Sequence, residues 1–300
     1  MANNKNKGGN KGSNQPNNTA NQNSATVKTK EQNVEKTEKV EEQVKVEPAA
    51  SAENKEQQNL NNQEQQQVKT KQTVVLIISK EDSAEIVELS LAAWKKNLPD
   101  CEIYLANGKF NELPVIEHEP NTDENINFAN ILAACVAEEN VCDKFIVSPV
   151  STFPVQISLE GIDLLVHTKK DFCGQQISIC SELSRVSVVE ALKKEGITEV
   201  KNFETGMPVV FEKELLGVAF EKFNPQKAPL KFITLYLNFF NQGKESVPTD
   251  YVDKHATAVW RRQPRLEIVK RGLGISKYFM LNNDGYLAVG KIIEQIVFAK

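Results

Sequence analysis

The sequence predicts an α/β fold: a doubly wound, mostly parallel sheet with an α-rich C-terminal half, preceded by a disordered N-terminal tail. Three observations lead to this prediction. Residues 1–72 contain no aromatic residue, so a packed core can begin only after them. Residues 73–79 (TVVLIIS) form a continuous β-branched run, which is typical of a strand buried on both faces of a parallel sheet. A helix and a second strand follow before residue 108, which favours a right-handed βαβ unit.

The N-terminal tail has an unusual composition. Asn, Gln, Lys and Glu account for 45 of its 72 residues, and Leu60 is its only leucine. Such a segment cannot bury enough apolar surface to offset the ordering of its backbone, which costs about 1–2 kcal/mol per residue. We therefore expect residues 1–72 to be disordered and residues 73–300 to form one α/β domain. The tail is either a flexible solubilising tether or a segment that orders on a protein partner.

Hydrophobic periodicity predicts the elements of the first half. A helix is expected from about Asp82 to Asn97, ended by Leu98-Pro99, and a second strand over residues 101–108. One face of that helix collects Ile86, Leu89, Ala93 and Trp94. Further strands are expected at LPVIEH (residues 113–118), DKFIVSPV (143–150) and GIDLLVHT (161–168), and a further helix from Asp123, with Cys135 on its apolar face. Later helices are expected at VSVVEALKKEG (186–196), FEKELLGVAFEKF (211–223), LKFITLYLNFFNQ (230–242) and YLAVGKIIEQIVF (286–298).

Composition also excludes several classes of protein. Residues 73–300 carry 25 Lys and Arg against 31 Asp and Glu, a net charge of −6, which argues against an extended nucleic-acid-binding surface. No apolar run approaches the roughly 20 residues that span a bilayer, and the first residues resemble no secretory signal. The five cysteines form no CxxC pair, which favours reduced thiols in a cytoplasmic compartment.

The order and spacing of these elements resemble the GT-A type of glycosyltransferase, the nucleotide-diphospho-sugar transferase fold. TVVLIIS, the following helix and CEIYLANG resemble the first βαβ unit of that family, where the nucleotide lies. ENINFANILAACVAEENVCDKFIVSPVSTF resembles its next helix and strand. ETGMPVVFEKELL and KYFMLNNDGYLAVGKIIEQIVF resemble the distal region of capsule-type and phage-encoded relatives, where the acceptor site is shaped. The resemblance covers the chain from about Thr73 to its end.

One departure from the family bears directly on the chemistry. Family members end the strand corresponding to residues 143–150 with Asp-x-Asp, whose carboxylates hold a divalent cation on the diphosphate. This chain has Ser148-Pro149-Val150 there, followed by Ser151-Thr152. Hard cations need oxygen ligands, preferably charged ones, so no metal site is predicted. Activity, where present, would then be metal-independent, with side-chain cations stabilising the leaving diphosphate.

Candidate binding residues follow from strand ends and from clustered positive charge. In α/β folds ligands lie beyond the carboxyl ends of strands, which points to Ser79, Asn107, Ser148 and Ser151. Lys169 follows another expected strand, and Arg suits bidentate phosphate binding. The segment WRRQPRLEIVKR holds four of the five arginines, and its Arg261 and Arg262 are either a diphosphate clamp or part of a solvated basic patch.

An inverting transferase also needs a base to deprotonate the acceptor hydroxyl. Candidates are Asp253 and His255 in PTDYVDKHA, Glu204 in FETGMP and Asp284 in LNNDG. The alternative for Asp253 and Glu204 is ordinary solvation at the surface. For LNNDG it is a plain turn, because Asn, Asp and Gly favour turns.

Two hypotheses therefore stand. In the first, the chain transfers a sugar from a nucleoside diphosphate to a glycan, a protein or another hydroxyl acceptor. In the second, it is a non-catalytic GT-A-like structural or interaction protein, for example a phage virion or cargo component tethered by its polar tail. The expected location is the cytoplasm, or a virion if a phage encodes the chain. A plain Rossmann-like domain is disfavoured because no glycine-rich turn follows the first strand.

Overall fold

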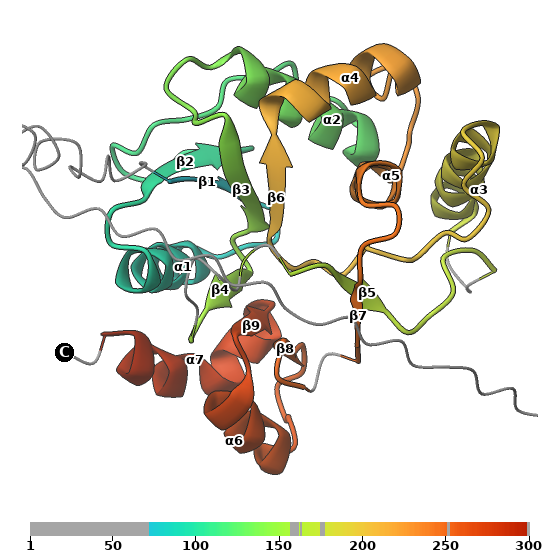
Figure 1. The fold of residues 1–300 in the computed structure, drawn as a ribbon. Coiled ribbons are helices and arrows are strands. Elements are labelled where there is room, and N and C mark those ends of the chain that lie inside the picture. Colours follow the sequence, from blue (N-terminus) through green and yellow to red (C-terminus); the bar gives the residue numbers. More distant parts are fainter. Residues whose placement is uncertain (1–71, 157–161, 163, 175–177, 251–252, 299–300) are drawn as a thin grey trace, which may run out of the picture. The chain divides into compact units, whose positions relative to one another are not determined.

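The central sheet contains the βαβ unit that the sequence predicts. A computed structural model describes residues 72–156, 162, 164–174, 178–250 and 253–298, so the expected disorder of the tail lies outside the described residues. The sheet has the order β2-β1-β3-β6, with the first three strands parallel and β6 antiparallel (Figure 1). Its strands are β1 (Thr73–Ile77), β2 (Glu102–Ala106), β3 (Lys144–Pro149) and β6 (Val209–Glu212).

Two smaller sheets accompany the central one. In the first, β9 (Tyr278–Leu281) lies between β4 (Thr152–Pro154), which is antiparallel to it, and β8 (Ala256–Val259), which is parallel. In the second, β5 (Val166–Thr168) pairs in parallel with β7 (Val247–Thr249). Because parallel pairs outnumber antiparallel ones among the described strands, the predicted α/β class with a mostly parallel sheet is confirmed.

The predicted helices are present, and most are shifted by two or three residues at their ends. The helix Ile179–Lys194, however, begins seven residues before the predicted segment 186–196, and the helix Leu266–Ile275 was not predicted. None of the helices in the described ranges has the length and apolarity needed to cross a membrane. The helix α1 ends before Pro99 and buries its predicted apolar face, and Asp123 caps α2 by accepting from two backbone N–H groups. The helices are α1 (Ala84–Asn97), α2 (Glu124–Ala137), α3 (Ile179–Lys194), α4 (Lys213–Phe223), α5 (Phe232–Phe240), α6 (Leu266–Ile275) and α7 (Asn283–Phe298).

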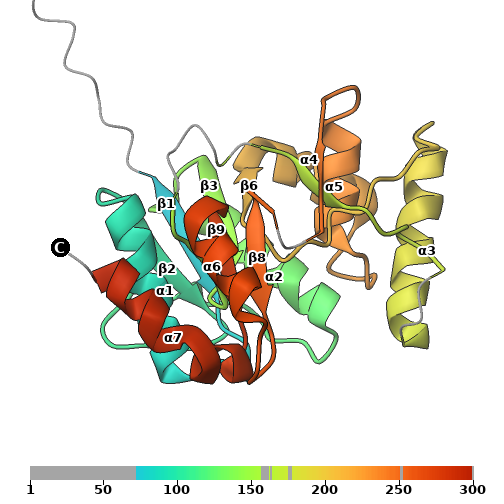
Figure 2. The ribbon, with the colours of Figure 1, turned by 90° about the horizontal axis from the view of Figure 1, so that it is seen from below.

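Apolar side chains cover both faces of the central sheet. On one face, Val75, Phe145 and Phe211 pack with α2, α4 and α5, where Cys135 lies in the core as predicted. On the other face, Val74 and Ile146 pack with α1 and with the sheet β4-β9-β8. The helices α1 and α7 lie side by side in both ribbon views (Figures 1 and 2) and enclose a third cluster with α6 and β9.

The observed strands differ from the predicted ones in both directions. The strands β4, β6, β7, β8 and β9 come from segments in which the pattern predicts no strand, and two predicted strands are reduced. LPVIEH forms a single bridge, from Val115 to Leu105, and the described residues of GIDLLVHT contain β5, which pairs outside the central sheet. The first residues of FEKELLGVAFEKF end β6 instead of starting a helix. Strands of three or four residues are too short to be recognised by alternating side chains. Pairing with a neighbouring segment determines where they form.

Candidate functional site

Four strands bring their carboxyl ends to one edge of the fold. The Val150 N–H donates to the Ile77 carbonyl at 3.0 Å, which joins the end of β3 to that of β1. The Leu281 N–H donates to the Ser151 carbonyl at 2.8 Å, which joins the end of β9 to the same turn. Because β8 runs parallel to β9, the residues after Val259 emerge on this side as well. We call this region the carboxyl edge.

The start of α7 connects the loop after β1 with the arginine segment. The Asn283 Oδ1 atom accepts from the Ser83 N–H at 3.2 Å, and its amide nitrogen donates to the Glu81 carbonyl. The next residue, Asp284, accepts from Arg262 Nε at 2.8 Å. The loop after β1 and Arg262 therefore contact adjacent residues of one helix turn.

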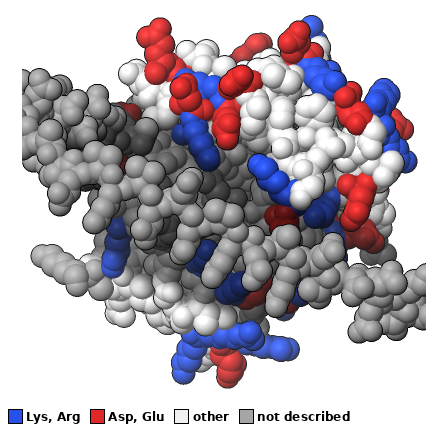
Figure 3. All heavy atoms as spheres, viewed as in Figure 1, with Lys and Arg blue, Asp and Glu red and all other residues white. Residues whose placement is uncertain are grey.

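The charges at this edge are open to solvent. The Arg262 and Asp284 side chains are 74% and 47% exposed, and their hydrogen bond raises the pKa of the Arg262 guanidinium. Arg261 and Trp260 are exposed beside them. In Figure 3, acids and bases mix over the upper part of the visible face, whereas the lower end, where Figure 1 places α6, is mostly basic. A guanidinium held this way can bind a phosphate oxygen without rearranging the backbone.

Two further predicted binding residues lie at neighbouring strand ends. Asn107 follows β2 with a positive φ of 67°, and its Oδ1 atom accepts from the Asn127 amide of α2 at 2.9 Å. Ser79 follows β1, is exposed, and donates its N–H to Asp82 at 2.7 Å. Burial raises the pKa of Asp82, partly opposed by that hydrogen bond.

The turn that replaces the acidic motif is closed by its own side chains. Ser148, Val150 and Thr152 are fully buried, and the Ser148 hydroxyl contacts the carbonyls of Pro149 and Thr152 at 3.1 and 3.2 Å. Ser151 is half-buried. The Ser148 hydroxyl therefore holds the turn between β3 and β4 and does not face solvent.

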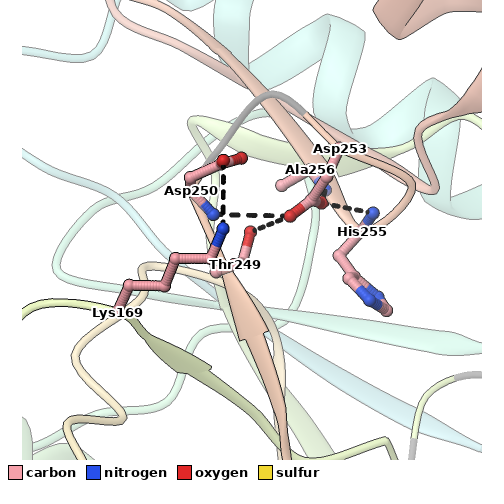
Figure 4. Close-up of polar contacts among 6 residues, drawn as sticks. All are labelled: Lys169, Thr249, Asp250, Asp253, His255 and Ala256. Atoms are coloured by element: carbon pink, nitrogen blue, oxygen red, sulfur yellow. Dashed lines mark hydrogen bonds and ion pairs between the residues drawn. The ribbon is translucent and has the colours of Figure 1, made fainter.

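A second group of predicted residues gathers around the β7–β8 connection (Figure 4). Lys169, after β5, forms an exposed ion pair with Asp250 at 3.3 Å. Asp253 lies at the centre of the group, where one carboxylate oxygen accepts from the Thr249 hydroxyl at 2.8 Å and the other from the His255 N–H at 2.7 Å. The N–H groups of Ala256 and Asp250 add longer contacts of 3.3 and 3.4 Å.

Asp253 and His255 do not form a catalytic pair through their side chains. The Asp253 carboxylate bonds the backbone of His255, and the imidazole points away from it (Figure 4). Burial acts to raise the pKa of Asp253, but the hydrogen bonds from His255, Thr249, Ala256 and Asp250 hold it below its ordinary value. Burial lowers the pKa of His255, although the Asp253 charge opposes this. An aspartate so placed stabilises a turn.

Glu204 likewise has a structural contact. Its carboxylate accepts from the Thr234 N–H in the first turn of α5 at 3.2 Å, where helix N–H groups lack partners inside the helix. Its own N–H donates to Asn202 at 3.1 Å. Glu204 therefore supports the start of α5.

The predicted site residues thus divide into two sets. The carboxyl edge collects Ser79, Asn107, Ser151, Arg261, Arg262 and Asp284, with Ser148 buried beneath it. Lys169, Glu204, Asp253 and His255 lie elsewhere, and Asp253 and His255 precede β8, whose four residues span about 13 Å. The sequence also missed Asn283. LNNDG reads as a turn, yet it forms the start of α7, where Asn282 accepts from the Gly285 N–H at 2.9 Å.

The described ranges contain no cluster of three or more His, Cys, Asp or Glu side chains suited to a metal ion. A cavity of about 250 Å³ lies apart from the carboxyl edge, along β6 and α5. The carboxyl edge offers arginine and amide groups that could bind phosphate, and Lys80 is exposed in the loop after β1.

Comparison with known proteins finds glycosyltransferases among the solved structures that resemble this chain. No family model matches the chain, and no curated protein matches it. Among solved structures, the galactosyltransferase LgtC with donor and acceptor sugar analogues is 11% identical, with a TM-score of 0.37, over 75% of this chain and 95% of that one. A glycosyltransferase involved in the glycosylation of the major capsid of PBCV-1 is 8% identical, with a TM-score of 0.38, over 75% of this chain and 99% of that one. The glycosyltransferase GlyE of Streptococcus pneumoniae is 9% identical, with a TM-score of 0.38, over 77% of this chain and 61% of that one. All three are described as glycosyltransferases.

Proposed function

We propose that this chain is a glycosyltransferase-like protein whose carboxyl edge binds a nucleoside-diphosphate sugar without a metal ion. One observation carries the proposal. Asn283 contacts the loop after β1, and the adjacent Asp284 holds Arg262, so a guanidinium lies where strand ends meet. The position beyond the carboxyl ends of parallel strands is where α/β proteins bind nucleotides.

Each group at this edge has a role in the proposal. Arg261 and Arg262 take the diphosphate, whose negative charge grows as the bond to the sugar breaks. Asn107 and the exposed backbone near Ser79 contact the nucleoside. Asp284 orients Arg262, and in this proposal its carboxylate accepts the proton of the acceptor hydroxyl. The acceptor oxygen then bonds the anomeric carbon, and the nucleoside diphosphate leaves.

A second candidate function rests on a separate observation. The turn Ser148–Thr152 is packed shut, and Asp253 and Glu204 bind the chain's own backbone. This arrangement favours a non-catalytic protein that retains the architecture as a structural or interaction module. A protein or glycan partner, and a location in the cytoplasm or in a virion, remain predictions under either function.

Calorimetry with UDP-, GDP- and CMP-sugars distinguishes the two functions. We expect binding of one donor class that persists in EDTA, and at least tenfold weaker binding in Arg262→Gln. Arg265→Gln is the matched control, because Arg265 is an exposed arginine of the same segment for which no bond to Asp284 is described. Binding without turnover would favour the non-catalytic function. If no donor binds, the nucleotide-sugar proposal is wrong.

A further inference from the structure

The turn after β2 contains the one Asn-Gly pair of the sequence, Asn107-Gly108. Asn107 is exposed, and its backbone has a φ of 67°, a conformation that asparagine tolerates better than most residues. A Cβ atom at position 108 would stand 3.1 Å from Cδ1 of Ile78, so glycine lets the chain pass close to that side chain. The fold therefore favours this pair of residues at this turn.

Asparagine is a chemically labile residue because its side chain can react with the following backbone nitrogen. That nitrogen loses its proton and attacks the side-chain carbonyl carbon, ammonia leaves, and a cyclic succinimide forms. Water then opens the ring at one carbonyl to give aspartate, or at the other to give isoaspartate. A glycine in the following position makes the attack easiest, because no Cβ atom shields its nitrogen.

The attacking nitrogen is available in this turn. Among the described residues, none accepts a hydrogen bond from the Gly108 N–H. The related pair Asp284-Gly285 differs, because it lies in α7 and the Gly285 N–H donates to Asn282 Oδ1 at 2.9 Å. A hydrogen bond donated by an N–H group opposes the loss of its proton. The Gly108 nitrogen is therefore the more reactive of the two.

One contact restrains the Asn107 side chain. Its Oδ1 atom accepts from the Asn127 amide of α2 at 2.9 Å, and this hydrogen bond is exposed. The bond fixes the orientation of the Asn107 carboxamide, whereas the attack requires the side-chain carbon to turn toward the Gly108 nitrogen. The reaction therefore becomes faster when the contact with Asn127 opens.

We propose that Asn107 is a site of spontaneous deamidation, in which Gly108 supplies the nucleophile and the contact with Asn127 slows the reaction. Both products carry a carboxylate in place of a neutral amide, and isoaspartate also adds a methylene group to the main chain. The modification therefore places a negative charge at the carboxyl edge. It needs no substrate, so it does not depend on the proposed binding of a nucleotide sugar.

The test incubates the purified full chain at mildly alkaline pH and follows each asparagine by peptide mapping with mass spectrometry. Asn111 is the internal control, because it is exposed and has a positive φ of 53° but precedes Glu112. We expect Asn107 to convert at least tenfold faster than Asn111 and to give isoaspartate, which a protein isoaspartyl methyltransferase labels. Equal rates at the two positions would refute the proposal.

One variant tests the nucleophile. Gly108→Ala should slow the conversion of Asn107 at least tenfold, because the new Cβ atom hinders the attack by the backbone nitrogen. An unchanged rate would show that this nitrogen is not the nucleophile, and the proposal would fail. The comparison of Asn107 with Asn111 in the wild-type chain decides the site even if Gly108→Ala does not fold.

A pair of variants in α2 tests the restraint. Asn127→Ala should speed the conversion of Asn107 at least twofold, because the carboxamide is then free to turn. Asn130→Ala is the matched control, since it removes the contact of another α2 amide, with the Glu119 carbonyl at 2.8 Å, and should leave the rate unchanged. A slower or unchanged rate in Asn127→Ala, or an equal increase in both variants, would show that the contact with Asn127 does not restrain the reaction.

Discussion

Asp253 is expected to stabilise the β7–β8 connection, and Asp253→Asn tests this directly. The native carboxylate accepts the four hydrogen bonds of Figure 4, two at each oxygen. An amide keeps one acceptor oxygen, which will turn toward the N–H groups of His255 and Ala256. The Thr249 hydroxyl can rotate to donate elsewhere, but the remaining N–H loses its partner. Hydrogen bonds to charged groups contribute about 1.5–3 kcal/mol each, so we expect a loss of about 2 kcal/mol, and more for Asp253→Ala.

The pH dependence gives this prediction a sign. The pKa of Asp253 in the folded protein lies below its ordinary value of 3.8. The folded state therefore binds fewer protons than the unfolded state in that range, and the stabilisation is present above the unfolded pKa. It is lost as the pH falls through the folded pKa. The difference in unfolding free energy between wild type and Asp253→Asn should be full at pH 7 and shrink below about pH 4.

Urea unfolding followed by tryptophan fluorescence measures these differences. Asp250→Asn is the matched control, because it removes a neighbouring carboxylate whose ion pair with Lys169 is exposed and contributes about 0–1 kcal/mol. A structural role requires that Asp253→Asn cost clearly more than Asp250→Asn. Equal stability of the two variants, or a gap that does not shrink at all as the pH falls below 4, would refute the reasoning.

Three other outcomes are expected. In Gly285→Ala the new Cβ would stand 1.7 Å from the Val259 carbonyl oxygen at the end of β8, so α7 must shift, and calorimetry should show a loss of unfolding free energy of about 1–3 kcal/mol. Gly217→Ala, in open space on α4, is the control and should gain about 1 kcal/mol. Unchanged stability of Gly285→Ala would contradict the close contact. Because burial lowers the pKa of His255, the unfolded state takes up its proton first, and stability should fall as the pH drops below 6.5. In His255→Leu the urea midpoint should depend less steeply on pH between pH 5 and 7, and an unchanged pH dependence would count against this prediction. Cys180 is exposed, whereas burial raises the pKa of Cys135 to about 12, so Ellman's reagent should label Cys180 fastest in the native chain and reach Cys135 only on unfolding; early labelling of Cys135 would argue against its place in the core.

The sequence alone does not predict which contacts the candidate site residues make. Asp253 and His255 are candidate bases by residue type, and residues two apart share a face only on a strand. They instead precede β8, and the carboxylate binds the backbone. Clustering identifies Arg262 and residue type identifies Asp284 as a candidate base, but no pattern predicts that the two side chains, 22 positions apart, bind each other.

The first half of the domain could be read from the chain because its elements are long and regular. A buried β-branched run, a helix with one apolar face and a capped second helix depend on neighbours within a few positions, so β1, α1 and α2 follow from local pattern. Cys135 is in the core for the same reason. Tertiary structure alone decided the short strands β6 to β9, the closing of Ser148 into its own turn and the contact of Asn283 with the loop after β1. Those outcomes depend on which of several equally suitable partners, up to 200 positions away, the folded chain brings within hydrogen-bond distance, and no local periodicity records that choice.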